Sequence, residues 1–157
     1  MEIYLLRHGI AEDGGPGVPD SERALTSEGK EKLRRVLKQA GVKPSLILSS
    51  PLKRAMETAE IAADVAGYSG KVVRTRALIP EASPFDAWDE VRAHKNEDSV
   101  LLASHEPLMS ALAAFLLDSP ALQVDMKKAA LVRIDCERIG AEPRGVLKWM
   151  LTPAVAQ

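Results

Sequence analysis

The chain contains 157 residues, of which 46% are hydrophobic and 27% charged, and its formal net charge at pH 7 is −1. This length fits one domain, residues 1–157, with a buried core, and the near-zero charge argues against a protein that finds nucleic acid by broad electrostatic attraction. No apolar run approaches the roughly 20 residues that cross a bilayer. The short apolar start has no basic leader, so we expect a cytoplasmic protein without a membrane partner. The single cysteine, Cys136, cannot form an internal disulfide.

The first predicted element is a buried strand at residues 3–6, which leads directly into Arg7-His8-Gly9. Residues 12–20 are rich in glycine and proline and are predicted to form a loop. Thr26 is a favourable N-cap for the helix that follows, because its hydroxyl can accept a hydrogen bond from a free backbone amide. Gly41 is predicted to end this helix, because glycine readily takes the left-handed conformation found at helix ends.

A second strand is predicted at residues 46–48, followed at once by Ser49-Ser50-Pro51. Ser50 is the predicted cap of the next helix and Pro51 its first residue, where proline's missing amide hydrogen is harmless. Gly67 closes that helix, and residues 72–73 are predicted as a short third strand.

The second half of the chain continues the alternation of helices and strands. The predicted elements are a helix starting near Pro84, a strand at 100–103, an apolar helix at 107–117, and two closing strands at 129–134 and 146–151, as a hairpin or edge pair. Such alternation indicates an α/β sandwich with a mostly parallel sheet.

Polar side chains gather where three of the predicted strands end. Arg7 and His8 follow the first strand, Ser50 and Arg54 follow the second, and His105 follows the fourth. Sheets of this kind bind ligands beyond the carboxyl ends of their strands. We therefore expect these side chains to form one site.

The residue types at these positions suit the transfer of a phosphoryl group. An imidazole, His8, can act as a nucleophile, while Arg7, Arg54 and His105 can supply fixed positive donors for the charge that develops on the phosphate oxygens. The guanidinium group of Arg54 can hold two of those oxygens in a planar fork. Gly9 has no side chain, so a ligand or another loop can approach its backbone closely. No metal or other cofactor is needed if the arginines supply the charge.

Three blocks of the sequence carry a family resemblance: Leu6-Arg7-His8-Gly9, Ser49-Ser50-Pro51 continuing through Arg54-Ala55 to Thr58-Ala59, and His105-Glu106-Pro107. These blocks resemble the histidine phosphatase superfamily, which also includes the cofactor-dependent phosphoglycerate mutases. Two further blocks look like the small bacterial phosphohistidine phosphatases of the SixA type: Arg23-Ala24-Leu25-Thr26 with Gly29, and Leu78-Ile79-Pro80 leading to Ala82-Ser83-Pro84.

The resemblance implies a three-layer α/β/α sandwich of the phosphoglycerate mutase-like fold. It also implies that His8 is the nucleophile and becomes a phosphohistidine, and that Arg7, Arg54 and His105 form the phosphate pocket. Ser104 stands where relatives often carry glycine, and we expect this serine to adjust the polarity of the pocket.

A leaving alkoxide also needs a proton donor. Many relatives use a carboxylate between the third strand and the next helix, where this chain has Glu81. The alternatives are Glu106, which can instead cap its helix, and the loop acids Glu12, Asp13 and Asp20. Arg23 can face the mouth of the site and bind substrate, or it can be an ordinary ion-pair residue.

Only about 25 residues separate Val73 from Val100, and part of that segment is a predicted helix. Relatives acting on small metabolites often carry a helical insertion here that roofs the site, and no such lid fits in this chain. An open crevice favours a bulky phosphorylated substrate, with a histidine-phosphotransfer protein as the candidate partner.

Three other functions stay open on the sequence. A metallohydrolase using His8 and His105 would need ligand spacing that the chain lacks. A binding module could hold phosphate or a phosphoprotein without turning it over. A small-metabolite phosphatase or mutase would share the chemistry and differ only in its substrate.

Overall fold

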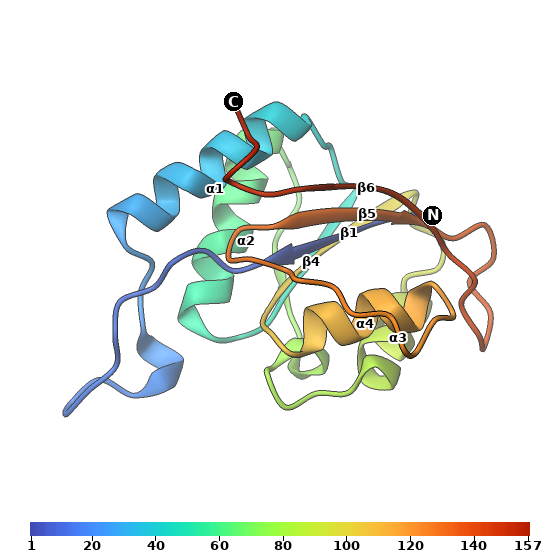
Figure 1. The fold of residues 1–157 in the computed structure, drawn as a ribbon, viewed down its shortest axis with the longest axis horizontal. Coiled ribbons are helices and arrows are strands. Elements are labelled where there is room, and N and C mark those ends of the chain that lie inside the picture. Colours follow the sequence, from blue (N-terminus) through green and yellow to red (C-terminus); the bar gives the residue numbers. More distant parts are fainter.

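The computed structural model describes all 157 residues and contains one six-stranded sheet in the order β3-β2-β4-β1-β5-β6 (Figure 1). Its strands are β1 (Glu2–Arg7), β2 (Leu46–Ser49), β3 (Val73–Arg74), β4 (Ser99–Ser104), β5 (Leu131–Asp135) and β6 (Val146–Leu151). The pairs β2–β3, β2–β4 and β1–β4 are parallel, whereas β5 runs antiparallel to both β1 and β6. The predicted parallel sheet closed by an antiparallel hairpin is therefore confirmed.

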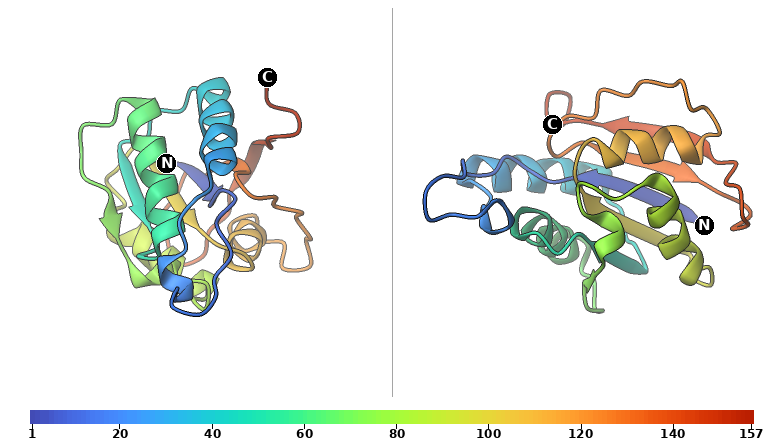
Figure 2. Two further views of the ribbon diagram at one scale, coloured as in Figure 1. Left: turned by 90° about the vertical axis from the view of Figure 1, so that its left-hand side faces the viewer. Right: turned by 90° about the horizontal axis from the view of Figure 1, so that it is seen from below.

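Four helices cover the two faces of this sheet (Figure 2). They are α1 (Ser27–Ala40), α2 (Lys53–Ala66), α3 (Pro84–Ala93) and α4 (Leu108–Leu116), with short 3-10 turns η1 (Asp20–Glu22) and η2 (Arg76–Leu78). Buried residues of α1 and α2 share one hydrophobic cluster with the sheet, and those of α3 and α4 share the other. This is the expected three-layer α/β/α sandwich. None of the helices has the length and apolar character that crossing a membrane requires.

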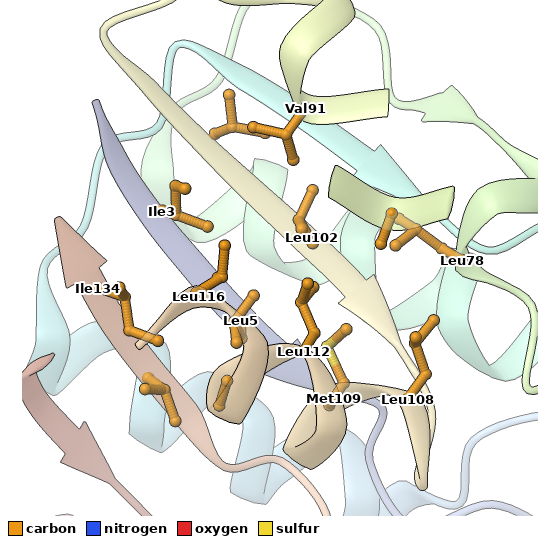
Figure 3. Packing of buried hydrophobic residues seen from close by; sticks show 14 of the residues in the cluster. Ile3, Leu5, Leu78, Val91, Leu102, Leu108, Met109, Leu112, Leu116 and Ile134 are labelled. Atoms are coloured by element: carbon orange, nitrogen blue, oxygen red, sulfur yellow. The ribbon is translucent and has the colours of Figure 1, made fainter. Parts of the chain in front are cut away.

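The central strands are buried on both faces, so their alternate side chains feed two separate cores. On β1, Ile3 and Leu5 belong to the cluster under α4, whereas Tyr4 and Leu6 belong to the cluster under α1. Figure 3 shows Leu112 of α4 packed against the strands in the cluster under α4. Two-sided burial explains why these strands are continuous apolar runs in the sequence.

Most helix boundaries follow the predicted caps, with one correction. The Thr26 hydroxyl accepts from the Gly29 amide at 2.9 Å, and Gly41 ends α1 with φ of 61°. The start of α2, however, is Lys53 and not Pro51, with Leu52 as its N-cap residue. Ser50 is not the helix cap, because the helix starts two residues later than expected; its hydroxyl accepts from the Leu52 amide at 3.3 Å and also contacts a side chain of the site described below.

The segment between β3 and β4 holds only η2 and α3. Ser83 starts α3 with a reciprocal capping box to Asp86. Trp88 and Val91 are buried against the sheet, while Phe85, which shares their spacing, is 67% exposed. The helix α3 is thus a layer of the sandwich and does not roof the strand ends.

Candidate active site

The carboxyl ends of three neighbouring strands, β2, β4 and β1, bring the predicted polar residues together. His8 follows β1 and His105 follows β4, and their ring centroids are 5.2 Å apart. Arg54 is the second residue of α2, which follows β2. All three side chains are almost fully buried, with residue exposures of 7%, 2% and 6% respectively. The sheet order therefore assembles the predicted cluster from distant parts of the chain.

The His8 ring is held in one tautomer by the backbone. Its Nδ1 lies 2.7 Å from the Gly9 carbonyl oxygen, which can only accept, so Nδ1 carries the proton and Nε2 keeps its lone pair. Burial lowers the pKa of His8 to about 4. The hydrogen bond to Gly9 raises this pKa, whereas the positive charges of Arg54, Arg7 and Lys128 lower it further. At neutral pH the ring is uncharged and has a free nitrogen lone pair.

Gly9 serves the packing of a helix, which differs from its expected role as a contact for substrate. A Cβ atom at this position would lie 2.8 Å from Leu33 Cδ1 and 3.2 Å from the Gly29 carbonyl oxygen, both on α1. The Gly9 amide is also occupied, because it donates to the Thr58 hydroxyl at 3.2 Å. The close approach that glycine permits here is made by α1, and the Gly9 amide is not free to bind a ligand.

His105 is oriented by the serine that the sequence suggested as a helix cap. Its Nε2 lies 2.7 Å from Ser50 Oγ. When the Ser50 hydroxyl donates to Nε2, the proton of the neutral ring is on Nδ1, which is buried and has no partner. Burial lowers the pKa of His105 to about 3, and the charges of His8 and Arg54 add to this effect.

The two arginines are anchored through part of their guanidinium groups. Arg54 donates from Nη1 to the Asp20 carbonyl at 2.9 Å and from Nη2 to the Asp20 carboxylate at 3.2 Å. Arg7 donates from Nη1 to the Met126 carbonyl at 2.9 Å. Thr58 ties α2 to the end of β1, because its hydroxyl donates to the Arg54 carbonyl and accepts from the Gly9 amide.

Three donors of this cluster are buried without any hydrogen-bond partner: Arg7 Nε, Arg54 Nε and His105 Nδ1. Buried polar groups in native proteins are nearly always paired, so an unpaired set in one place calls for a ligand that accepts hydrogen bonds. Two fixed guanidinium groups favour an anion. The arrangement therefore suits a tetrahedral oxyanion beside an uncharged imidazole. No group of three or more histidine, cysteine or acidic side chains in the structure is placed to hold a metal ion.

Of the acids considered from the sequence, Asp20 has ion pairs with two arginines of the predicted site. Hydrogen bonds from Arg23 and Arg54 lower the pKa of its carboxyl group, with Arg23 as the larger cause. Arg23 also donates to the Glu12 carbonyl, so it braces the loop that carries Asp20. Glu106 instead accepts from the Ser110 amide at 2.7 Å within the first turn of α4, which is the capping alternative.

Glu81 lies in the exposed loop between η2 and α3 and makes no hydrogen bond or ion pair. The loop starts close to His105, because Leu78 accepts a 2.6 Å hydrogen bond from the hydroxyl of Ser104, the preceding residue. That bond also corrects the expectation for Ser104, whose hydroxyl is used in packing and does not change the polarity of the pocket. The role of Glu81 as proton donor stays a prediction.

Sequence reasoning missed what three residues do at this site: Ser50, Thr58 and Lys128. Thr58 is four residues beyond Arg54 on the same helix, a spacing that puts both on one face. Ser50 was expected at the site, but its contact with His105 was not predicted, and Lys128 gave no signal; both depend on which strands and loops meet in space.

Comparisons with known proteins agree with this fold. A model of the histidine phosphatase superfamily, branch 1, matches residues 3–81. An uncharacterized protein of Picosynechococcus sp. is 33% identical over 164 residues, covering 96% of this chain and 99% of the relative.

Two solved structures are similar to this chain in both sequence and fold. The fold is the expected phosphoglycerate mutase-like α/β fold. The structure of the protein histidine phosphatase SixA complexed with tungstate is 25% identical, covers 98% of each chain and has a TM-score of 0.80. A protein described as a phosphohistidine phosphatase SixA, from Agrobacterium tumefaciens, is 25% identical, covers 97% of each chain and has a TM-score of 0.83.

Proposed function

Because this chain belongs to the histidine phosphatase superfamily and is a phosphatase, we propose that it removes phosphate from phosphohistidine on a protein, through a phosphorylated His8. In the first step His8 Nε2 attacks the phosphorus atom, a P–N bond forms, and the bond to the leaving group breaks. In the second step water attacks the same phosphorus and releases phosphate and the free His8 imidazole. The leaving group of the first step takes up a proton.

The tautomer of His8 is the observation that carries this proposal. A nucleophilic imidazole must be uncharged and must present a lone pair. The 2.7 Å contact between Nδ1 and the Gly9 carbonyl assigns the lone pair to Nε2, and the pKa of about 4 keeps the ring neutral at physiological pH.

The remaining residues of the cluster supply positive charge for the transferring group. Arg7, Arg54 and His105 each have an unpaired buried nitrogen that phosphate oxygens can satisfy. Donors fixed before the reaction stabilise a developing negative charge without reorganising during it. The proposed enzyme thus needs no metal ion for the chemistry.

A phosphoprotein substrate is favoured by the lack of a helical lid between β3 and β4 and by the SixA relatives. The segment from β3 to β4 places α3 against the sheet, so a phosphorylated side chain on another protein meets no lid. Both SixA structures cover almost all of this chain. We propose Glu81 as the proton donor for ester substrates. When the substrate is a phosphohistidine protonated on its other ring nitrogen, a neutral imidazole leaves and no such donor is needed.

A panel of phosphorylated substrates tests this proposal. It contains a phosphohistidine protein, a phosphoserine peptide, a sugar phosphate and an aryl phosphate, each assayed with the wild type, Glu81→Gln and Glu142→Gln as an exposed-loop control. We expect the highest kcat/KM on the phosphohistidine protein. Glu81→Gln should lower turnover of the esters by about 100-fold and leave phosphohistidine turnover unchanged. A strong preference for the sugar phosphate would instead establish a metabolite phosphatase.

Two further measurements address the mechanism. Rapid quenching during turnover should trap phosphate on the wild-type protein in an acid-labile, alkali-stable form, as expected of phosphohistidine. An excess of chelator should leave the rate unchanged, whereas loss of activity would support the metallohydrolase alternative.

A further inference from the structure

A groove with a volume of about 700 Å³ lies next to the predicted active site and is lined by five cationic side chains. These are Arg7, Lys32, Arg35, Lys127 and Lys128. No acidic residue lines it, although the whole chain has a formal net charge of −1. The charge of this basic groove is therefore a local feature that the composition conceals.

Three separate parts of the chain build the walls of the basic groove. One wall is α1, with Lys32 and Arg35, and another is the loop before β5, with Lys127 and Lys128. The third is the segment 152–154 after β6, which Figure 1 shows running beside α1. Arg35 joins the first and third walls, because its Nη2 donates to the Pro153 carbonyl.

The basic groove adjoins the catalytic cluster at Arg7. This arginine lines the groove, and the charge of Arg7 is also one cause of the lowered pKa of His8. The positive charge of Lys128, which also lines the groove, lowers the same pKa. The Ala129 amide donates to the carbonyls of both Arg7 and His8, which holds the lysine loop against the end of β1.

The five cations of the basic groove are either unpaired or held only in weak surface ion pairs. Lys32, Arg35 and Lys127 pair with exposed carboxylates at 2.9–3.3 Å, and such surface pairs are weak. Arg7 and Lys128 form no ion pair, and the Nε of Arg35 is buried without a partner. The groove therefore has unmet capacity to bind anions.

We propose that the basic groove binds an acidic segment of the phosphoprotein substrate, beside the phosphorylated side chain that enters the active site. This inference rests on the proposed function. A small ligand is normally enclosed over most of its surface, whereas Lys127 has a side chain that is 67% exposed, and Lys128 and Ala154 are exposed as well. Spaced cations on an open surface match carboxylates distributed along another protein chain. Contacts of this kind select the partner and speed its association.

Matched phosphohistidine peptides test the proposal. One has glutamates on both sides of the phosphohistidine, and the other has glutamines at the same positions. We expect the wild type to show about a tenfold higher kcat/KM on the glutamate peptide at low ionic strength, and the preference to shrink at high ionic strength.

The variant Lys32→Gln/Lys127→Gln removes two cations that lie in the groove but outside the catalytic cluster. It should reduce the preference for the glutamate peptide to about twofold, mainly through KM, and leave aryl phosphate turnover unchanged. The control Lys71→Gln/Lys95→Gln loses the same charge from exposed positions elsewhere and should keep the full preference. A full preference in the groove variant, or none in the wild type, would overturn the proposal.

A binding measurement separates this proposal from the proposed function. Fluorescence anisotropy with a labelled, unphosphorylated glutamate peptide needs no turnover, so it applies even if no substrate is hydrolysed. Weaker binding by the groove variant than by the control supports the docking site, and equal binding rejects it. Stronger displacement of the label by an oligothymidylate than by unlabelled peptide would point to nucleic acid and reject the acidic protein segment.

Discussion

The floor and the mouth of the active site are built in different ways. On the floor, His8, Arg54 and His105 are each no more than 7% exposed. The two histidine rings are fixed by a backbone carbonyl and a hydroxyl, and Thr58 fixes the main chain of Arg54. At the mouth, Asp20 and Glu81 lie on exposed loops. The floor is thus positioned by the packing that forms the sheet, whereas the mouth depends on a few polar contacts between loops.

This difference separates chemistry from selectivity. Groups that must meet phosphorus in a fixed geometry lie on rigid elements, where displacement is resisted by the core. Groups that meet the rest of the substrate lie on surface loops, where changes affect stability little. Substitutions on the floor should therefore remove turnover of every substrate, whereas substitutions at the mouth should change the turnover of some substrates and spare others.

The largest effect is expected from His8→Ala, which removes the proposed nucleophile. Turnover of every substrate should fall by at least about 1,000-fold, because no other imidazole can form the covalent intermediate. Circular dichroism should show a retained fold, and phosphate should still bind to the arginines. The control is His94→Ala, which removes a histidine that lies beside Glu90 at the end of α3. Unchanged turnover in His8→Ala would exclude the covalent mechanism.

The next largest effect is expected from Arg54→Lys, which keeps the charge and removes the planar fork. We expect kcat/KM to fall by about 100-fold, since an ammonium group cannot hold two phosphate oxygens together with Asp20. Arg34→Lys is the matched control, because Arg34 forms an exposed ion pair with Asp64 on the outer surface. A fall of less than about threefold in Arg54→Lys would mean that positive charge alone suffices.

The buried histidines should also make stability depend on pH. In the unfolded chain histidine has a pKa near 6.5, whereas burial lowers the pKa of His8 to about 4 and that of His105 to about 3. Between these values the unfolded state binds more protons, so the free energy of unfolding falls as the pH falls from about 6.5 towards 4. The loss should be on the order of 3 kcal/mol for each histidine.

Denaturant unfolding at several pH values measures this effect. The variant His8→Gln/His105→Gln should show a flatter pH dependence between pH 6.5 and about 4.5, while His94→Gln should follow the wild type. An equally steep dependence in the double variant would show that other groups titrate in this range.

The smallest effect is expected at the mouth, from Asp20→Asn. The Asp20 carboxylate accepts a hydrogen bond from Arg54 Nη2 at 3.2 Å. Replacing this carboxylate by a neutral amide should therefore strengthen phosphate binding and lower KM for an aryl phosphate by about two- to threefold. Asp13→Asn is the control in the same exposed loop. A fall in kcat of more than about tenfold would instead identify Asp20, and not Glu81, as the proton donor.

Much of the fold and of the floor could be predicted because local patterns determine them. Two-sided apolar runs such as residues 3–6 and 100–103 indicated buried parallel strands, and Thr26 and Gly41 marked the ends of α1. The position of His8 at a strand end then predicted which edge of the sheet it would reach.

The errors fell where a residue has two possible partners. Ser50 can cap a helix or bind His105, and Gly9 can admit a ligand or a helix. In each case the actual partner comes from another part of the chain: His105, which follows β4, contacts Ser50, and α1 packs against Gly9. Local propensity contains no information about such contacts.

The sequence by itself determined the alternation of strands and helices, the strand ends that carry polar residues, and the family to which those residues point. Periodicity and caps are short-range properties, so a single chain is enough to identify them. Only the tertiary structure decided the tautomer of His8, the unpaired donors around it and the basic groove beside it. These depend on distances between segments far apart in the chain, which are set by the order of the strands and the packing of the layers.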